Sequence, residues 1–496
     1  MSHKVREILV VSFFMLLFTF FASKGLWIGI TGVLVLFAAT FLLSPERCIM
    51  VLFLCYFFKF TIPVQVFGWR LLYQWVIFFW VGINILQISL SKGHIQEPLP
   101  RYLKRAKTCA YLFLAALGSV ILIRGAGFYR FGGNVIGGGQ YVMVILMIFA
   151  LLFSFRFVPS DRAWKRLTVM FIASSFFMFF IQYLIARGAF GVRSFFDVTA
   201  MGLALEEEGI SGVATAHVGR YVSLTHVSVS LLGIASIFWG KGKTPLYFIF
   251  VLFAVVIAAL SGYRRALLSL PMILSLFHLV HTKNKKKVLF VVALVGGLAL
   301  VSAYFLAPYL PFNVQRALAV LPGIGVEHAA SHAAKASSDW RIEIWAYCLE
   351  ELPRYLLLGK GALLSVADTI QNLGELATLG HQTDVIFRAH SYHSFLLSML
   401  LDLGLPATLA YIGLVVYLGR YFFSLKKRLH GVRYAVYCLL LAVWINQQLH
   451  QLYTTGLLAI IVSNLLFALF LLIVGSKADD GDATEGESCE ILGSRS

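Results

Sequence analysis

The stretch TGLLAIIVSNLLFALFLLIV, residues 455–474, carries no charged side chain along its length. A helix of this length spans the hydrocarbon core of a bilayer, which requires about 20 predominantly apolar residues. Similar runs recur from one end of the chain to the other. The sequence therefore predicts an all-α fold, a polytopic bundle of transmembrane helices.

The composition of the whole chain agrees with this prediction. Of its 496 residues, 59% are hydrophobic and 13% are charged, and the mean hydropathy is +0.84. Soluble domains are about half apolar and about a quarter charged, so a water-soluble globule is excluded. An outer-membrane barrel is disfavoured, because its strands alternate in polarity instead of forming unbroken apolar blocks.

Apolar runs bounded by charges or glycine predict about fourteen spanning helices. The first run is interpreted as a helix rather than a secretory signal, because residues 21–24 lack a small-x-small cleavage site. The weakest runs flank Ser261 to Ala266, so about twelve helices would also fit. The predicted spans are residues 8–23, 25–43, 48–67, 71–90, 108–123, 141–157, 167–186, 221–239, 245–260, 267–281, 288–306, 394–418, 433–450 and 455–474.

Lysine and arginine set the predicted topology, because cytoplasmic loops of membrane proteins are enriched in both. With the N-terminus inside, the basic residues collect in the loops around residues 92–107, 156–166, 283–287 and 420–433. The net charge of +18 is therefore assigned to topology and to contacts with membrane lipid, and nucleic acid is not expected as a partner. Both termini are expected in the cytoplasm.

This topology places two long loops, residues 187–220 and 307–393, on the external side, where function is expected. In the second loop an apolar stripe predicts a helix that begins with Asp339 as its N-cap and weakens at Pro353. The loop is expected to fold back onto the bundle. The expected parts of the chain are residues 1–306 and 394–475 in the membrane, the loop 307–393 between them, and a disordered cytoplasmic tail, residues 476–496.

Two arginines, Arg264 and Arg265, stand where a helix is predicted to begin on the external side. Guanidinium groups at a helix N-terminus form an anion site suited to phosphate. The alternative is that both side chains snorkel to the membrane interface. External cations run against the positive-inside rule, which favours a functional reason for them.

Two further stretches carry candidate catalytic residues. Arg341 is predicted in the first turn of the loop helix, where the dipole disfavours a cation unless an anion is near; a salt bridge to Asp339 or Glu343 is the alternative. His393 is predicted to begin a late spanning helix, whose dipole keeps the imidazole neutral and able to accept a proton. A metal site is a further alternative, disfavoured because no carboxylate or thiolate pattern completes it; its candidate ligands are His328, His332, His381, His390 and His393.

Together these stretches resemble the O-antigen ligase and O-antigen polymerase family of bacterial envelope glycan transferases. The resemblance covers roughly residues 220–418, and the sequence departs from the family's usual residues at Tyr263, Arg265 and Ser394. The matching positions, in the family's order, are Arg264 and Leu268, then Arg341, Trp345, Gly359 and Gly361, and finally His393 and Gly404.

The resemblance implies transfer of a glycan from a polyprenyl diphosphate carrier to a sugar hydroxyl, at the external face of the bacterial inner (plasma) membrane. Arg264 and Arg341 would stabilise the departing diphosphate, with Arg265 and Arg220 as helpers and without a metal or other cofactor. His393 would take the proton of the acceptor in a single displacement with inversion, because no nucleophilic carboxylate is evident nearby. The acceptor is either the lipid A core or the growing glycan chain, and it decides between ligase and polymerase.

Two other functions fit the sequence less well. A metal-dependent transferase of the oligosaccharyltransferase type relies on an Asp-x-Asp pattern in an early external loop, whereas the one here, Asp480 to Asp482, lies in the tail. A lipid-linked glycan flippase or other polysaccharide transporter is favoured by Lys59 inside a predicted span. A transporter is disfavoured because the polar groups concentrate at one face of the membrane instead of spreading over several helices.

Overall fold

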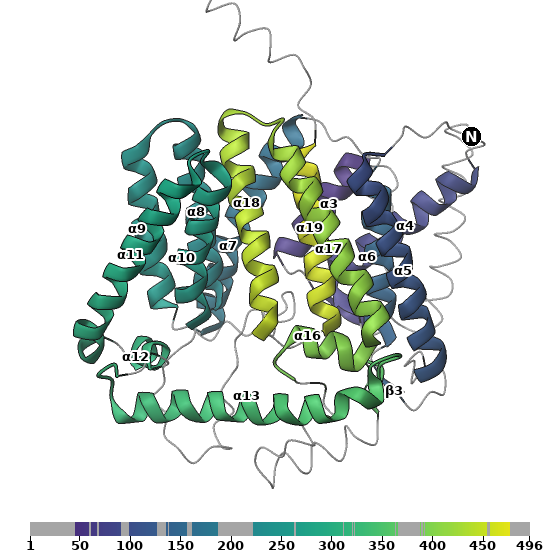
Figure 1. Ribbon diagram of the computed structural model, residues 1–496. Coiled ribbons are helices and arrows are strands. Elements are labelled where there is room, and N and C mark those ends of the chain that lie inside the picture. Colours follow the sequence, from purple (N-terminus) through teal and green to yellow (C-terminus); the bar gives the residue numbers. More distant parts are fainter. Residues whose placement is uncertain are drawn as a thin grey trace, which may run out of the picture.

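The computed structural model describes residues 45–58, 61–66, 69–90, 99–125, 135–136, 138–155, 161–186, 222–261, 264–310, 312–319, 321, 323–362, 364–365, 387, 390, 392–453 and 457–476. The chain is a bundle of helices (Figure 1), which confirms the all-α fold class. Within the described residues, strands are confined to two short antiparallel pairs. These are β1 (Thr61–Val66) with β2 (Trp69–Leu71), and β3 (Val135–Ile136) with β4 (Leu364–Ser365).

The helices follow the apolar runs of the sequence. Those before the long loop are α3 (Pro45–Phe58), α4 (Leu72–Leu90), α5 (Arg101–Arg124), α6 (Gly138–Ser154), α7 (Asp161–Ala186), α8 (Val222–Gly240), α9 (Thr244–Leu260), α10 (Arg264–His281) and α11 (Lys285–Leu306). The loop contains α12 (Phe312–Leu318) and α13 (His328–Tyr355), and after it come α16 (Phe395–Ser398), α17 (Gly404–Lys426), α18 (Gly431–His450) and α19 (Leu457–Gly475). A π-helical stretch, Met399–Leu403, joins α16 to α17 and is called the π-turn below.

Each predicted span that lies in the described part of the chain contains a helix. The prediction for residues 48–67 is wrong in its second half, because α3 ends at Phe58 and Thr61–Val66 forms β1. Pro63 breaks a helix, and the β-branched residues around it favour a strand. The predicted spans 8–23 and 25–43 lie outside the described residues, so the number of spanning helices stays a prediction.

Many of these helices are apolar enough to cross a membrane. Six apolar helices are shorter than a full span, among them Gly138–Ser154 and Leu224–Gly240. The stretches that are also long enough are Arg101–Arg124, Arg162–Leu184, Lys285–Tyr309, Phe395–Lys426 and Leu457–Gly475. The structure is therefore that of a helical membrane protein.

The uncharged run at residues 455–474 forms α19, which lies in the middle of the bundle against α6, α17 and α18. In the most apolar part of this helix 83% of the residues are buried, compared with 7% in the stretch Lys285–Tyr309, which contains α11. A helix that is apolar on all sides is stable where other apolar surfaces enclose it. Its polar residue Asn464 is also buried and donates a hydrogen bond to the Tyr411 hydroxyl over 2.7 Å. This helix organises the core.

The two ends of the bundle differ. Helix α13 runs across one end (Figure 1), which is called the α13 end below. At the opposite end, the Tyr434 hydroxyl donates to the His281 carbonyl over 2.8 Å, and Arg433 Nε donates to the Val474 carbonyl over 2.9 Å. These bonds join the ends of α10 and α19 to the start of α18. The basic loops around residues 283–287 and 420–433 lie here, and this end is called the basic end.

Candidate functional site

Helix α13 is much longer than predicted, and this changes the setting of Arg341. The helix begins at His328, with Glu327 as N-cap, and continues through Pro353 to Tyr355. The prediction of Asp339 as N-cap is therefore wrong, because Asp339 lies in the middle of the helix. Arg341 is consequently far from the first turn, and the dipole argument made for it no longer applies.

The glycines of the second motif allow the chain after α13 to lie directly on the π-turn. The amide of Lys360 donates to the Leu401 carbonyl over 2.7 Å, and the amide of Gly361 donates to the Asp402 carbonyl over 2.9 Å. A β carbon on Gly359, which has a φ of +65°, would lie 2.3 Å from the carbonyl oxygen of Asp402. A glycine is required here by both conformation and space.

Gly404, from the third motif, completes the same contact. It follows the π-turn with a φ of +80°, and a β carbon there would lie 2.5 Å from the Leu357 carbonyl oxygen. The next amide, that of Leu405, donates to the Leu356 carbonyl over 2.6 Å. The structure thus brings together Gly359, Gly361 and Gly404 from two separate motifs.

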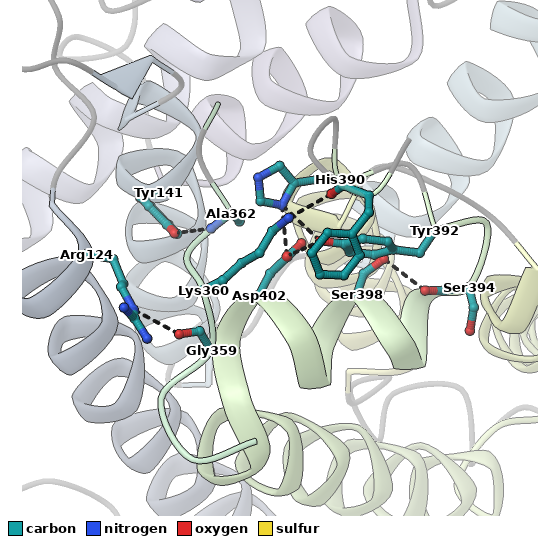
Figure 2. Close-up of polar contacts among 11 residues, drawn as sticks. Arg124, Tyr141, Gly359, Lys360, Ala362, His390, Tyr392, Ser394, Ser398 and Asp402 are labelled. Carbon is teal, nitrogen blue, oxygen red and sulfur yellow. Dashed lines mark hydrogen bonds and ion pairs between the residues drawn. The ribbon is translucent and has the colours of Figure 1, made fainter. Parts of the chain in front are cut away.

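The segment Gly359–Gly361 is also fastened to the bundle. Arg124 Nε, at the end of α5, donates to the Gly359 carbonyl over 2.9 Å, and the amide of Ala362 donates to the Tyr141 hydroxyl of α6 over 2.7 Å (Figure 2). Helices α5 and α6 therefore fix the segment on which the site is built.

His393 lies where α13 meets the start of α16. The ring of Trp340, on α13, contacts the His393 ring edge to face, with the ring centroids 4.6 Å apart. One turn further on, Trp345 Nε1 donates to the Tyr392 carbonyl over 2.9 Å. His393 itself has a φ of 50°, an unusual backbone conformation for a residue with a side chain. Two tryptophans of α13 therefore contact His393 and the residue before it.

The electrostatics of His393 depend on Arg341. Burial lowers the pKa of the His393 imidazole, and the nearby Arg341 cation lowers this pKa further. A lowered pKa agrees with the sequence prediction of a neutral imidazole. That prediction named the helix dipole as the cause, whereas the structure shows burial and a neighbouring cation. A neutral imidazole is able to accept a proton. The structure thus brings Arg341 and His393 together.

Arg341 is half-buried, and one of its hydrogen-bond donors has no partner among the described residues. Its Nε is buried and has no hydrogen-bond partner in the described part of the chain, and within that part no ion pair joins it to Asp339 or Glu343. The salt-bridge interpretation of Arg341 is therefore not supported. A buried guanidinium donor without a partner is costly, and an anion beside it would remove that cost.

Sequence reasoning missed a buried carboxylate in this site, Asp402, which is 1% exposed. Its Oδ1 lies 2.8 Å from His390 Nδ1 and accepts a hydrogen bond of 2.8 Å from the Tyr392 hydroxyl (Figure 2). Asp402 is the sole acidic residue in the sequence between His393 and Leu429. A carboxylate in an apolar run marks a functional position by default, and that signal would have found it.

A lysine and a thiol lie beside this carboxylate. Lys360 Nζ donates to the Phe387 carbonyl over 2.7 Å and lies 4.0 Å from the centroid of the Phe387 ring. Burial raises the pKa of the Cys348 thiol to about 12; the Lys360 cation lowers this pKa and the Asp402 carboxylate raises it. Both charges therefore lie close to the thiol. Burial, together with Asp402, also raises the pKa of Tyr392.

The first motif is placed only in part. Arg264 and Arg265 open α10, as predicted, but their side chains lie outside what the structure describes. Ser269 forms a hydrogen bond with His450 at the end of α18, and the adjoining turn, Gln451–Tyr453, contacts α16. Helix α10 thus begins at the α13 end. Arg220 lies outside the described residues.

The histidines named as candidate metal ligands are placed only in part. His328 and His332 lie one turn apart on α13, with ring centroids separated by 6.4 Å. Within the described residues, no three His, Cys, Asp or Glu side chains are grouped as metal ligands would be. His381 lies outside those residues.

The candidate site residues other than Arg220 fall within one segment of the chain that matches a family model. The segment contains Arg264, Arg341, the three glycines and His393. No curated protein matches the chain. Residues 248–412 match the family model described as O-antigen ligase, so this segment of the chain is similar to that family.

Proposed function

We propose that this protein transfers a glycan from a polyprenyl diphosphate carrier to a sugar hydroxyl at the external face of the bacterial inner membrane. The family match supports a membrane enzyme that transfers glycans. One observation carries the finer proposal. Arg341, with a buried Nε that lacks a partner in the described part of the chain, lies beside a His393 whose pKa is lowered.

The α13 end is the external end in this proposal. The exposed cations of the basic end include Lys285, Lys427 and Arg428, and such residues are retained on the cytoplasmic side. With that orientation both termini are cytoplasmic. The site then faces the compartment in which a glycan already moved across the membrane is available.

The arginines act on the leaving group. When the anomeric carbon–oxygen bond breaks, the electron pair leaves with the polyprenyl diphosphate, and negative charge grows on that group. Arg341 and Arg264, helped by Arg265 and Arg220, stabilise this charge in a site of low dielectric. Preorganised cations supply this stabilisation, so the reaction needs no metal or other cofactor.

His393 acts on the acceptor. Its neutral imidazole accepts the proton of the sugar hydroxyl while the hydroxyl oxygen bonds to the anomeric carbon, which inverts that centre. The sequence argument that no carboxylate lies nearby needs correction, because Asp402 bonds to His390 and Tyr392. Asp402 is 1% exposed, however, and a carboxylate enclosed in this way is poorly placed to attack the donor. Single displacement remains the proposed course.

The test is transfer by the purified protein in lipid nanodiscs, with a purified lipid-linked donor and a saccharide acceptor. We expect release of free polyprenyl diphosphate, and we expect His393→Ala to lower the rate by at least about 100-fold, as loss of a general base does. His390→Ala, which removes a histidine of the same segment, should be milder. Near-wild-type rates for both variants would contradict the role of His393.

The acceptor is tested in cells. In a deletion strain, long glycan chains that stay on the carrier would identify a ligase, and single repeat units on the lipid A core would identify a polymerase. A transporter would instead move labelled donor across vesicles without releasing the diphosphate carrier. Lys59, the residue that favoured a transporter, lies outside the described residues.

A further inference from the structure

We propose that Asp402 is a positioning residue of the transfer site, which holds the segment carrying His393 in its active conformation through hydrogen bonds to Tyr392 and His390. This inference rests on the proposed function, because it assigns Asp402 a role in the same reaction. It adds to the site a residue from inside a predicted membrane span, residues 394–418.

The segment before α16 does not hold its conformation by itself. His390 has a φ of 56° and His393 a φ of 50°, and both residues carry side chains. Residues with side chains adopt this left-handed region at a cost, and they persist there where surrounding contacts hold them. Something other than local preference must therefore fix this segment.

Asp402 supplies those contacts from the π-turn. One carboxylate oxygen, Oδ1, lies 2.8 Å from His390 Nδ1 and accepts the Tyr392 hydroxyl over 2.8 Å (Figure 2). Its partners are the residue before His393 and the residue three positions before it. Because both bonds end on a single buried atom, a shift of Asp402 moves the whole segment.

Asp402 is itself held in place by the backbone around it. The π-turn that contains it receives amide hydrogen bonds from Lys360 and Gly361 through the carbonyls of Leu401 and Asp402. π-Helical turns are rare and often occur at functional sites. The position of the carboxylate is thus set by the two glycine motifs, and the position of His393 is set by the carboxylate.

Packing alone does not explain a charge at this position. Asp402 Oδ2 is buried and forms no hydrogen bond within the described residues. A carboxylate buried with an unsatisfied oxygen is costly, and an apolar residue would fill the same space at less cost. The hydrogen bonds of the other oxygen, Oδ1, with His390 and Tyr392 therefore explain why a carboxylate is present here.

The experiment compares Tyr392→Phe and Asp402→Asn with Tyr437→Phe as the matched control. Tyr392 and Tyr437 are both fully buried, and each donates one hydrogen bond from its hydroxyl, but Tyr437 donates to the Phe422 carbonyl at the basic end. We expect the two site variants to lower kcat by about tenfold or more with KM changed less than about twofold, since misplaced catalytic groups slow the chemical step. The double variant should be no slower than Asp402→Asn alone, because both changes break one link.

A second readout does not depend on transfer. Diethyl pyrocarbonate modifies neutral histidines, and the rate at which it modifies His393 can be followed by mass spectrometry. We expect this rate to rise severalfold in Tyr392→Phe and Asp402→Asn and to stay unchanged in Tyr437→Phe. Unchanged modification and unchanged kcat, or equal losses in Tyr437→Phe, would overturn the positioning role. If modification rises while His393→Ala remains active, the positioning stands and the proposed function fails.

Discussion

The α13 end and the basic end of the bundle both collect charged and polar residues, but they hold them differently. At the basic end the cations are exposed or bind helix carbonyls, as Arg433 binds the carbonyl of Val474 over 2.9 Å. At the α13 end Asp402 is buried and Arg341 Nε is both buried and, in the described part of the chain, without a hydrogen-bond partner. The first arrangement is complete within the protein. The second is suited to binding a charged ligand.

Backbone conformation differs in the same way. Gly242, in the turn between α8 and α9 at the basic end, has a φ of +70° and open space around its α carbon. Gly359, at the α13 end, has a φ of +65° and backbone atoms within contact distance. The basic end uses glycine for a turn, whereas the α13 end uses it to bring two segments together.

The largest effect should come from adding a methyl group at each of these glycines. Gly359→Ala would place a β carbon 2.3 Å from the Asp402 carbonyl oxygen, so the π-turn has to move. We expect a loss of transfer of about 100-fold, which displacements of about 1 Å can cause. Gly242→Ala should cost only the backbone strain of about 1 kcal/mol and keep its activity. Equal activity of the two variants, measured per amount of folded protein, would remove the distinction between the ends.

The next largest effect is expected from a substitution of Arg264, the arginine at the start of α10. A bidentate guanidinium contact with a diphosphate is not reproduced by an ammonium, so we expect Arg264→Lys to lower transfer by at least about tenfold, or roughly 1.4 kcal/mol of transition-state stabilisation. Arg70, in β2 and outside the motifs, is the control and should tolerate lysine. Similar turnover of a lipid-linked donor by Arg264→Lys and Arg70→Lys would favour snorkelling over diphosphate binding.

A smaller change is expected in the pH profile. The Arg341 cation lowers the pKa of His393, so Arg341→Gln should raise this pKa. Activity that requires the neutral imidazole is lost as the pH falls through that pKa, and the acid limb of kcat should therefore move to higher pH. Arg354, exposed and paired with Glu351 at 2.7 Å on the same helix, provides the control variant Arg354→Gln. An acid limb that moves to lower pH, or that does not move, would show that the Arg341 charge does not lower the pKa of His393.

The smallest effect is expected from chelation. Since arginines are proposed to stabilise the diphosphate, transfer by protein treated with EDTA should equal that of untreated protein. Loss of turnover on chelation, followed by recovery with a divalent cation, would make His328, His332 or His390 candidate ligands again. It would also leave Arg341 without its proposed role in binding the diphosphate.

The sequence by itself determined the membrane bundle, because apolar runs of spanning length leave few alternatives in water or in lipid. It also indicated the resemblance to the O-antigen ligase and polymerase family, from motifs whose order is visible without a structure, and residues 248–412 match that family's model. It did not give the true start of α13, because a helix of moderate polarity can begin at any of several capping residues. Nor did it give the end of α3, where a proline and β-branched residues overrode an apolar run.

Only the tertiary structure decided how the motifs meet. Gly359 and Gly404 are needed because two backbones approach each other in space, and no spacing along the sequence reports that approach. Asp402 was read as part of a predicted span, since a single carboxylate changes the hydropathy of a long run very little. Its role follows from two partners, His390 and Tyr392, which a π-helical turn brings within 2.8 Å. Hydropathy is a sum over neighbours in the sequence, whereas a site depends on directions and distances that the folded chain alone sets.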